Sequence, residues 1–185
     1  PLGVRLAPFG RVDPDEARAA FKEQIEGLVA GGPDLIIIET MTDLYEVREA
    51  IKAAKEVSDL PVLASMTFTR DDKTLLGDSP VKVATRMADA GADVIGINCS
   101  GGPAQLLRIL RKMRTAQPDA LYSVMPNAGW PEQTAGRIMY PAGPEYFGQY
   151  AQAFAQAGAR LIGGCCGTTP EHIQAMHIDL PAPLQ

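Results

Sequence analysis

The sequence predicts an α/β fold built on parallel strands, and two features carry that prediction. Short apolar runs alternate with segments whose apolar residues recur at helical spacing. An internal sequence repeat supports the same fold: residues 90–96 (AGADVIG) resemble residues 157–163 (AGARLIG), and residues 30–36 are a looser copy. Each copy joins a helix end to a buried strand, so the chain consists of βα units that form a parallel sheet or a (β/α) barrel.

Five strands and six helices follow from this pattern. Uninterrupted apolar runs, typical of parallel strands covered on both faces, predict strands at residues 35–38, 61–66, 94–97, 121–125 and 161–163. Asp, Ser or Thr caps and first-turn prolines predict helices that begin near residues 13, 43, 79, 103, 144 and 169. Asp43, with Glu46 three residues later, predicts a capping box.

The strand count leaves two architectures open. A (β/α)8 barrel has eight strands and runs to about 250 residues, so a barrel would lack three units in this chain of 185 residues. An open, doubly wound sheet of five strands would be complete at this length. Such sheets often carry a glycine-rich phosphate loop, and the sequence contains neither G-x-G-x-x-G nor G-x-x-x-x-G-K.

Composition narrows the class of partners. The net charge is −5 and 21% of residues are charged, which argues against nucleic acid or an anionic membrane as the main partner, since both need clustered Lys and Arg. The sequence has no membrane-length apolar run and no N-terminal signal segment, so a cytoplasmic location is expected. Three cysteines are too few for a secreted disulfide framework.

The three cysteines follow the ends of predicted strands. In parallel βα folds these ends share one edge, where ligands bind. Cys99 follows the third strand, and Cys165 and Cys166 follow the fifth, so a flat sheet would hold them about 10 Å apart and barrel curvature would bring them closer. Three thiolates with an open fourth position suit zinc, which keeps a bound thiol in its nucleophilic form. Structurally buried thiols and a vicinal disulfide at Cys165–Cys166 are the alternatives.

Other side chains near this edge give weaker signals. Glu39 ends a buried strand, where a substrate ammonium group, an arginine or a helix N-terminus would satisfy it. The sequence is equally consistent with Asn127 as a turn residue and as a site residue. Three aromatic residues after the fourth strand could line the mouth of the site, but packing in the core or on the surface is favoured; they are Trp130, Tyr140 and Tyr146. A solvated helix face is expected for Arg108, Arg111, Lys112 and Arg114, and a structural or solvent-facing role for His172 and His177.

Two cysteine motifs in this order resemble the homocysteine S-methyltransferase family. Residues 163–173 (GGCCGTTPEHI) resemble its zinc motif, and residues 96–99 (GINC) resemble its other zinc-ligand strand. Residues 38–41 (IETM) and 125–129 (MPNAG) are similar to its further signatures. Residues 74–77 and 123–127 most resemble the methionine-synthase-like branch and bifunctional proteins that join this domain to a methylenetetrahydrofolate reductase.

The resemblance implies both a fold and a chemistry. It implies a partial (β/α)8 TIM barrel, with about five C-terminal βα units (strands 4–8) in residues 1–178, a tail at residues 179–185, and the first three units absent. It implies that Cys99, Cys165 and Cys166 bind zinc, that zinc activates the homocysteine thiol without a further catalytic residue, and that Glu39 holds the amino group. The implied substrate-binding residues are Glu39, Ser65, Asn98, Asn127 and Gly167. The implied methyl donor is cobalamin- or folate-linked, with a sulfonium or ammonium compound as the alternative.

Three expectations for function result. The first is zinc-dependent methyl transfer to homocysteine, giving methionine, by a barrel fragment that is incomplete for catalysis. The second is a non-catalytic zinc-binding or structural fragment of a larger methyltransferase, and the third is an unrelated five-stranded open α/β protein. In a partial barrel two sheet edges would be unpaired, and a missing N-terminal barrel segment, further domains or a homodimer would cover them.

Overall fold

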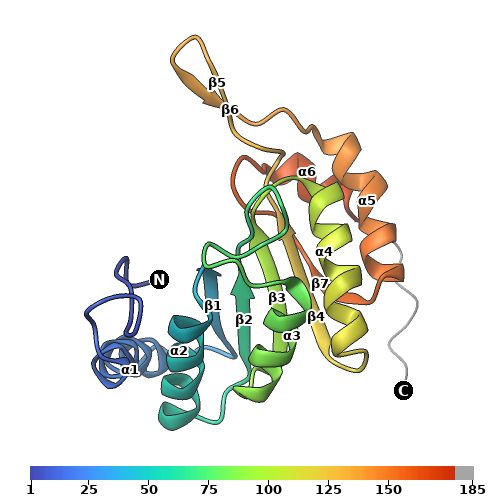
Figure 1. Ribbon diagram of the computed structural model, residues 1–185. Coiled ribbons are helices and arrows are strands. Elements are labelled where there is room, and N and C mark those ends of the chain that lie inside the picture. The colour runs from blue at the N-terminus through green and yellow to red at the C-terminus, as the bar shows by residue number, and fades with distance from the viewer. Residues whose placement is uncertain (178–185) are drawn as a thin grey trace, which may run out of the picture.

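Five parallel strands form the centre of the computed structural model, which describes residues 1–177 (Figure 1). All five predicted strands are present, and their order in the sheet is the order in the chain: β1 (Ile36–Met41), β2 (Val62–Met66), β3 (Val94–Cys99), β4 (Leu121–Pro126) and β7 (Ala159–Ile162). A doubly wound sheet reverses its strand order at a switch point. Because this sheet has no such reversal, the doubly wound alternative is wrong and the topology is that of a barrel segment.

All six predicted helices are present: α1 (Pro14–Ala30), α2 (Leu44–Val57), α3 (Pro80–Asp89), α4 (Pro103–Ala116), α5 (Pro144–Gln156) and α6 (Pro170–Ala175). Asp43 caps α2 as predicted, since its side chain accepts a hydrogen bond from the Tyr45 N–H. The predicted capping box is wrong, because the Glu46 carboxylate accepts the Leu2 N–H instead of reaching back to Asp43. No helix among the described residues has the length and apolar character needed to cross a membrane.

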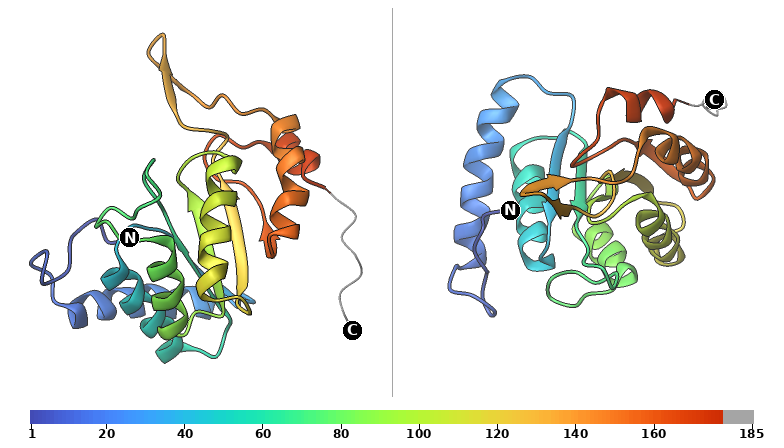
Figure 2. Two further views of the ribbon diagram at one scale, coloured as in Figure 1. Left: turned by 45° about the vertical axis from the view of Figure 1, so that its right-hand side comes forward. Right: turned by 90° about the horizontal axis from the view of Figure 1, so that it is seen from above.

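The helices cover only one face of the sheet. Seen from above, they form an arc along its outer side (Figure 2). Alternate strand residues such as Ala64, Ile97 and Val124 face these helices and are completely buried. On the opposite face Ile37 is 51% exposed and Leu121 is 50% exposed. Apolar residues line this face too, as they line the interior of a barrel, so the sheet is consistent with part of a barrel wall.

The numbering of these strands as barrel strands 4–8 and the boundary at residue 178 remain predictions. Residues 178–185, which include the predicted tail, lie outside the described residues.

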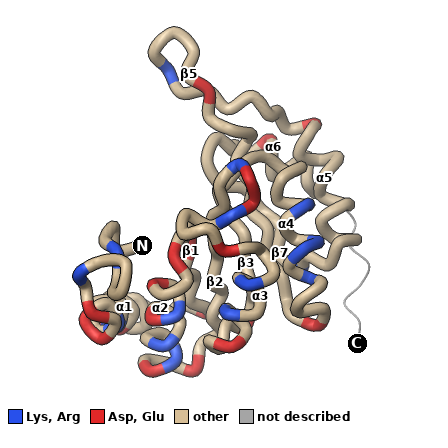
Figure 3. Tube along the Cα trace, in the orientation of Figure 1, with Lys and Arg blue, Asp and Glu red and all other residues tan. Residues whose placement is uncertain are grey.

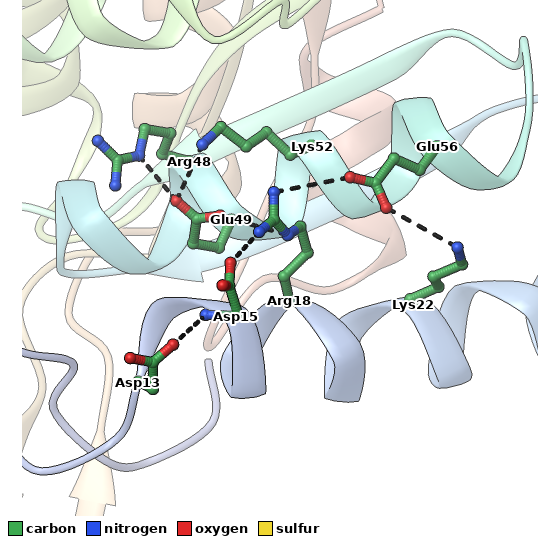
Figure 4. Close-up of polar contacts among 8 residues, drawn as sticks. All are labelled: Asp13, Asp15, Arg18, Lys22, Arg48, Glu49, Lys52 and Glu56. Carbon is green, nitrogen blue, oxygen red and sulfur yellow. Dashed lines mark hydrogen bonds and ion pairs between the residues drawn. The ribbon is translucent and has the colours of Figure 1, made fainter.

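Helix α1 packs against α2 through a polar network (Figure 4). The Glu49 carboxylate is buried and accepts hydrogen bonds from Arg48 Nε at 2.9 Å and from Lys52 Nζ at 3.2 Å. Arg18 of α1 reaches Glu49 at 3.8 Å and Glu56 at 3.7 Å. Because a buried carboxylate is costly without partners, this network fixes how α1 lies on α2.

The loop between β2 and α3 is tied to α4 by Asp72. This buried carboxylate accepts bonds from Arg108 Nε at 2.7 Å, Arg108 Nη2 at 2.8 Å and Lys112 Nζ at 2.9 Å. Burial raises the pKa of Asp72, but the hydrogen bonds from Arg108, Lys112 and Gln105 outweigh it and lower the pKa to about 2. Arg108 and Lys112 thus lie on an exposed helix face, as expected, and both also bind the buried Asp72.

A hairpin that the sequence pattern did not indicate projects from the body between β4 and α5 (Figure 1). Its strands are β5 (Glu132–Thr134) and β6 (Arg137–Met139), and all six strand residues are exposed. The turn residues Ala135 and Gly136 both have positive φ, at 49° and 77°, as in a two-residue hairpin turn. Its three-residue strands are too short for an alternating pattern to reveal them.

Candidate functional site

The three cysteine thiols converge at the carboxyl edge of the sheet. Cys99 ends β3, and Cys165 and Cys166 lie in the loop after β7. The Sγ–Sγ distances are 3.1 Å for Cys99–Cys165, 3.6 Å for Cys99–Cys166 and 3.9 Å for Cys165–Cys166. Three sulfurs at the corners of a tetrahedron with Zn–S bonds of about 2.3 Å would stand about 3.8 Å apart. The residues present therefore fit zinc, with the fourth corner left for a substrate.

A local turn brings the Cys99 sulfur to this edge. In an extended strand Cys99 would share the side of Ile97, which faces the helices. Instead Cys99 and Ser100 adopt φ of 54° and 60°, a left-handed conformation that is uncommon outside glycine. The Ser100 side chain supports the turn by accepting the Phe68 N–H at 2.8 Å. Left-handed residues outside glycine are strained and persist where surrounding contacts hold them.

Asn127 joins the two cysteine loops. Its Oδ1 accepts the Cys166 N–H at 3.0 Å, and its Nδ2 donates to the Ser100 carbonyl at 3.0 Å. The neighbouring Ala128 N–H donates to the Cys166 carbonyl at 2.9 Å. Asn127 is buried, so these bonds make it a clamp between the loops rather than a simple turn residue.

Asn98 joins the thiol cluster to the end of β1. Its Oδ1 accepts the Thr40 N–H at 2.9 Å, and its Nδ2 donates to Thr40 Oγ1 at 2.7 Å. The same Nδ2 lies 3.3 Å from Glu39 Oε2 and 3.8 Å from Cys165 Sγ. An exposed carboxylate thus stands beside the sulfurs, at a position open to a cationic group. Thr40, with φ of 59°, was missed by the sequence reasoning, because only the folded chain shows its contact with Asn98.

Tyr140 also lies at the cluster, which agrees with the site-mouth alternative and not with the ordinary packing that was favoured for it. Its ring covers Gly167, since a Cβ on Gly167 would stand 2.3 Å from Tyr140 Cγ. Gly167 also has φ of 78°, so two separate features require glycine there. Burial raises the pKa of the Tyr140 phenol, and the adjacent Cys166 raises it further. No local pattern distinguishes Tyr140 from Trp130 and Tyr146 as the aromatic residue at the thiols, because 25 residues separate it from Cys165.

Ser65 lies deeper in the sheet than the other predicted site residues. It pairs in register with Gly96, two residues before Asn98, and is 1% exposed. A Cβ on Gly96 would stand 1.9 Å from Ser65 Oγ. The described contacts therefore place Ser65 below the thiol cluster and not against it.

Burial raises the pKa of the Cys99 thiol far above its usual value, and the nearby Cys165 and Cys166 sulfurs raise it further. Three thiolates at these distances repel one another strongly unless a cation lies among them. His172 has the structural role expected of it: it is buried, and its Nδ1 accepts the Thr169 N–H at 3.1 Å.

The fold and the site together define a βα-barrel-type protein with a three-thiol centre suited to zinc. The sequence profile of the family described as homocysteine S-methyltransferase matches residues 1–180. The chain belongs to the homocysteine S-methyltransferase family.

Two methionine synthases are among its relatives. The protein from Mycobacterium tuberculosis is 34% identical over 178 residues, and that from Mycobacterium leprae is 33% identical over 178 residues. In each case the match covers 93% of this chain and 15% of the relative. The chain therefore spans about 15% of the length of these relatives, and their names describe much longer proteins.

The homocysteine methyltransferase MmuM from Escherichia coli has a similar fold. Its apo form superposes with a TM-score of 0.73 at 22% identity, covering 93% of this chain and 60% of that one. Its metallated form superposes with a TM-score of 0.72 at 25% identity, covering 90% of this chain and 52% of that one.

Proposed function

We propose that this chain binds zinc through Cys99, Cys165 and Cys166, binds homocysteine beside it, and serves in methyl transfer to the homocysteine sulfur to give methionine. The observation that carries the proposal is the convergence of three thiols within 3.9 Å in a member of this family. A bound zinc ion would hold the homocysteine thiol as its thiolate, the nucleophilic form.

The residues of the chain would orient the substrate. Glu39 presents a carboxylate to the substrate ammonium group, and Asn98 fixes that carboxylate from 3.3 Å. Asn127 holds the two cysteine loops at one separation. In the transfer a sulfur–methyl bond forms as the donor–methyl bond breaks, the bonding pair leaves with the donor, and the thiol proton has already passed to solvent. Such a reaction depends mainly on in-line placement of the two reactants.

A complete active barrel would need chain beyond these five strands. The exposed Ile37 and Leu121 on the uncovered face support this part of the proposal, as does the 60% coverage of MmuM. A second copy in a homodimer is the other way to cover that face. A cobalamin- or folate-linked methyl donor and a cytoplasmic location also belong to the proposal.

Metal analysis with homocysteine titration tests the proposal. We expect about one zinc per chain, and a cobalt-substituted protein whose sulfur-to-cobalt absorption changes when homocysteine, but not methionine, is added. Cys166→Ser should lose most of the metal. Glu39→Gln should keep the metal and bind homocysteine more weakly. Metal binding without any response to homocysteine would favour a non-catalytic zinc fragment, and absence of metal binding would refute the proposal.

A further inference from the structure

A cleft lies beside the thiol cluster, between the first turns of α4 and α5. Its volume is about 610 Å³, and none of the three cysteines lines it. Two backbone bonds connect it to the cluster, from Ala142 N to Ala128 O at 2.8 Å and from Ala128 N to Cys166 O at 2.9 Å. Trp130 and Arg70 line one part of it and Arg108 another.

The cleft carries positive charge without a lining carboxylate. The Arg70 guanidinium lies 4.5 Å from the centroid of the Trp130 ring, and within residues 1–177 it forms no ion pair. Arg108 uses Nε and Nη2 for Asp72, which leaves Nη1 available. Figure 3 shows Lys and Arg positions both on the loop after β2 and on α4. The described lining contains no Asp or Glu. Asp72, outside the lining, offsets the charge of Arg108, so the uncompensated charge is that of Arg70, and it favours an anion.

The start of α5 adds to this preference, although Glu145 lies in its first turn; in α4 the first residue is Pro103, which has no N–H, and the Gln105 N–H already donates to Gly102 O. The N-cap residues are Gly102 for α4 and Gly143 for α5, and neither offers a side-chain acceptor to the first-turn N–H groups. These two glycines also line the cleft. Helix N-termini carry partial positive charge and bind anions through their backbone N–H groups.

Gln105, at the inner wall of the cleft, has an acceptor that lacks a donor. The residue is 6% exposed, and its Nε2 donates to Thr69 O at 2.7 Å and to Asp72 Oδ1 at 3.2 Å. These two acceptors fix the amide orientation, and its Oε1 has no hydrogen-bond partner in the described part of the chain. A Cβ on Gly101 would stand 2.5 Å from this oxygen and 2.4 Å from the indole Nε1 of Trp130. The glycine thus keeps polar atoms of both side chains close together beside the cleft, and buried polar atoms normally find partners.

We propose that this cleft binds a small oxyanion, a phosphate or a carboxylate, that also carries a hydroxyl group. The anionic group would lie between Arg70, Arg108 and the start of α5. Gln105 Oε1 is sealed from solvent beside the Trp130 indole, so the hydroxyl would donate to it once that ring moves aside. The inference depends on the geometry of the cleft and not on methyl transfer, so each can fail without the other.

Tryptophan emission provides a direct test, because Trp130 is the one tryptophan in the chain. The protein would be titrated separately with inorganic phosphate and with malate at constant ionic strength, with calorimetry in parallel. We expect one saturable site for at least one probe. Arg70→Ala should weaken binding about fivefold or more. Arg111→Ala removes the same charge from an exposed position on α4 outside the cleft, and should change affinity less than about twofold.

The probes also identify the chemistry. Binding of phosphate alone supports a phosphate ester as the ligand, and binding of malate alone supports a hydroxycarboxylate. Absence of saturable heat and of emission change with both probes overturns the proposal. Equal weakening by Arg70→Ala and Arg111→Ala also overturns it, because that result indicates nonspecific charge attraction. Saturable binding of tetramethylammonium in place of the anions overturns it in favour of an aromatic cation site.

Discussion

Asn127→Ala tests whether the clamp between the two cysteine loops positions the sulfurs. The variant removes two hydrogen bonds of 3.0 Å each. A neutral hydrogen bond contributes about 1 kcal/mol net, and a buried group left without its partner costs about 1–3 kcal/mol. Ser100 is buried, so its carbonyl would lose its donor, whereas Cys166 is exposed and water can replace the lost acceptor. We therefore expect the free energy of unfolding to fall by about 2–3 kcal/mol.

The same change should also weaken metal binding. Groups that orient metal ligands typically contribute 10- to 100-fold to affinity, and Asn127 holds both loops that carry the thiols. Competition with a chromophoric zinc chelator measures zinc affinity in the absence of denaturant, where the variant is folded. Urea unfolding measures its stability. Gln174→Ala removes an exposed amide from α6 and is the control, with both quantities expected near those of the unsubstituted chain. If Asn127→Ala binds zinc as tightly as the control, the positioning argument is refuted.

Two further predictions concern backbone strain and pH. Gly167→Ala should lower the free energy of unfolding by about 2–4 kcal/mol, because it combines a left-handed φ of 78° with contact against Tyr140. In a Tyr140→Ala background only about 1 kcal/mol should remain, and equal losses in both backgrounds, measured by urea unfolding, would contradict this. The folded-state pKa of Asp72 is about 2, below the ordinary carboxyl value of 3.8. Its stabilisation is therefore present above about pH 4 and is lost as pH falls through about 2. The partners Arg108 and Lys112 have side chains 51% and 48% exposed, so we expect at most about 2 kcal/mol. In Asp72→Asn, the free energy of unfolding should lack this dependence on pH between pH 4 and pH 2. If its slope against pH is the same as in the unsubstituted chain, Asp72 does not cause the loss of stability in acid.

The order of helices and strands was predictable from the sequence because its signals are local. Pro and Gly mark most element boundaries, as Pro80 and Gly91 do around α3, where Gly91 has φ of 95°. The position of the cysteines after β3 and β7 was predictable for the same reason. Their sulfur separations were not, because they depend on curvature added up across three neighbouring strands.

Contacts between distant segments account for the remaining differences. Glu46 has the right spacing for a capping box with Asp43, but the folded chain brings the Leu2 N–H to it. Arg108 and Lys112 have the helical spacing of a solvated face, but the loop after β2 brings Asp72 over them. In both cases a charged side chain found a partner about 40 residues away, and no local pattern contains that information.

Asn98 and Asn127 each stabilise a backbone position with a left-handed φ through a side-chain hydrogen bond. The backbone is irregular at Thr40 near the end of β1 and at Ser100 after β3, each with a left-handed φ that costs on the order of 1 kcal/mol. A buried amide from another strand holds each position: Asn98 accepts the Thr40 N–H, and Asn127 donates to the Ser100 carbonyl. Asn127 then also accepts the Cys166 N–H. These bonds connect four of the five strand ends in series, from β1 through β3 and β4 to the loop after β7, and they include the Cys166 N–H. A change at either amide should therefore alter the spacing of the three thiols, of which only Cys165 Sγ lies within hydrogen-bond distance of one of these amides, that of Asn98 at 3.8 Å. Metal affinity is for this reason the sensitive measure of this arrangement.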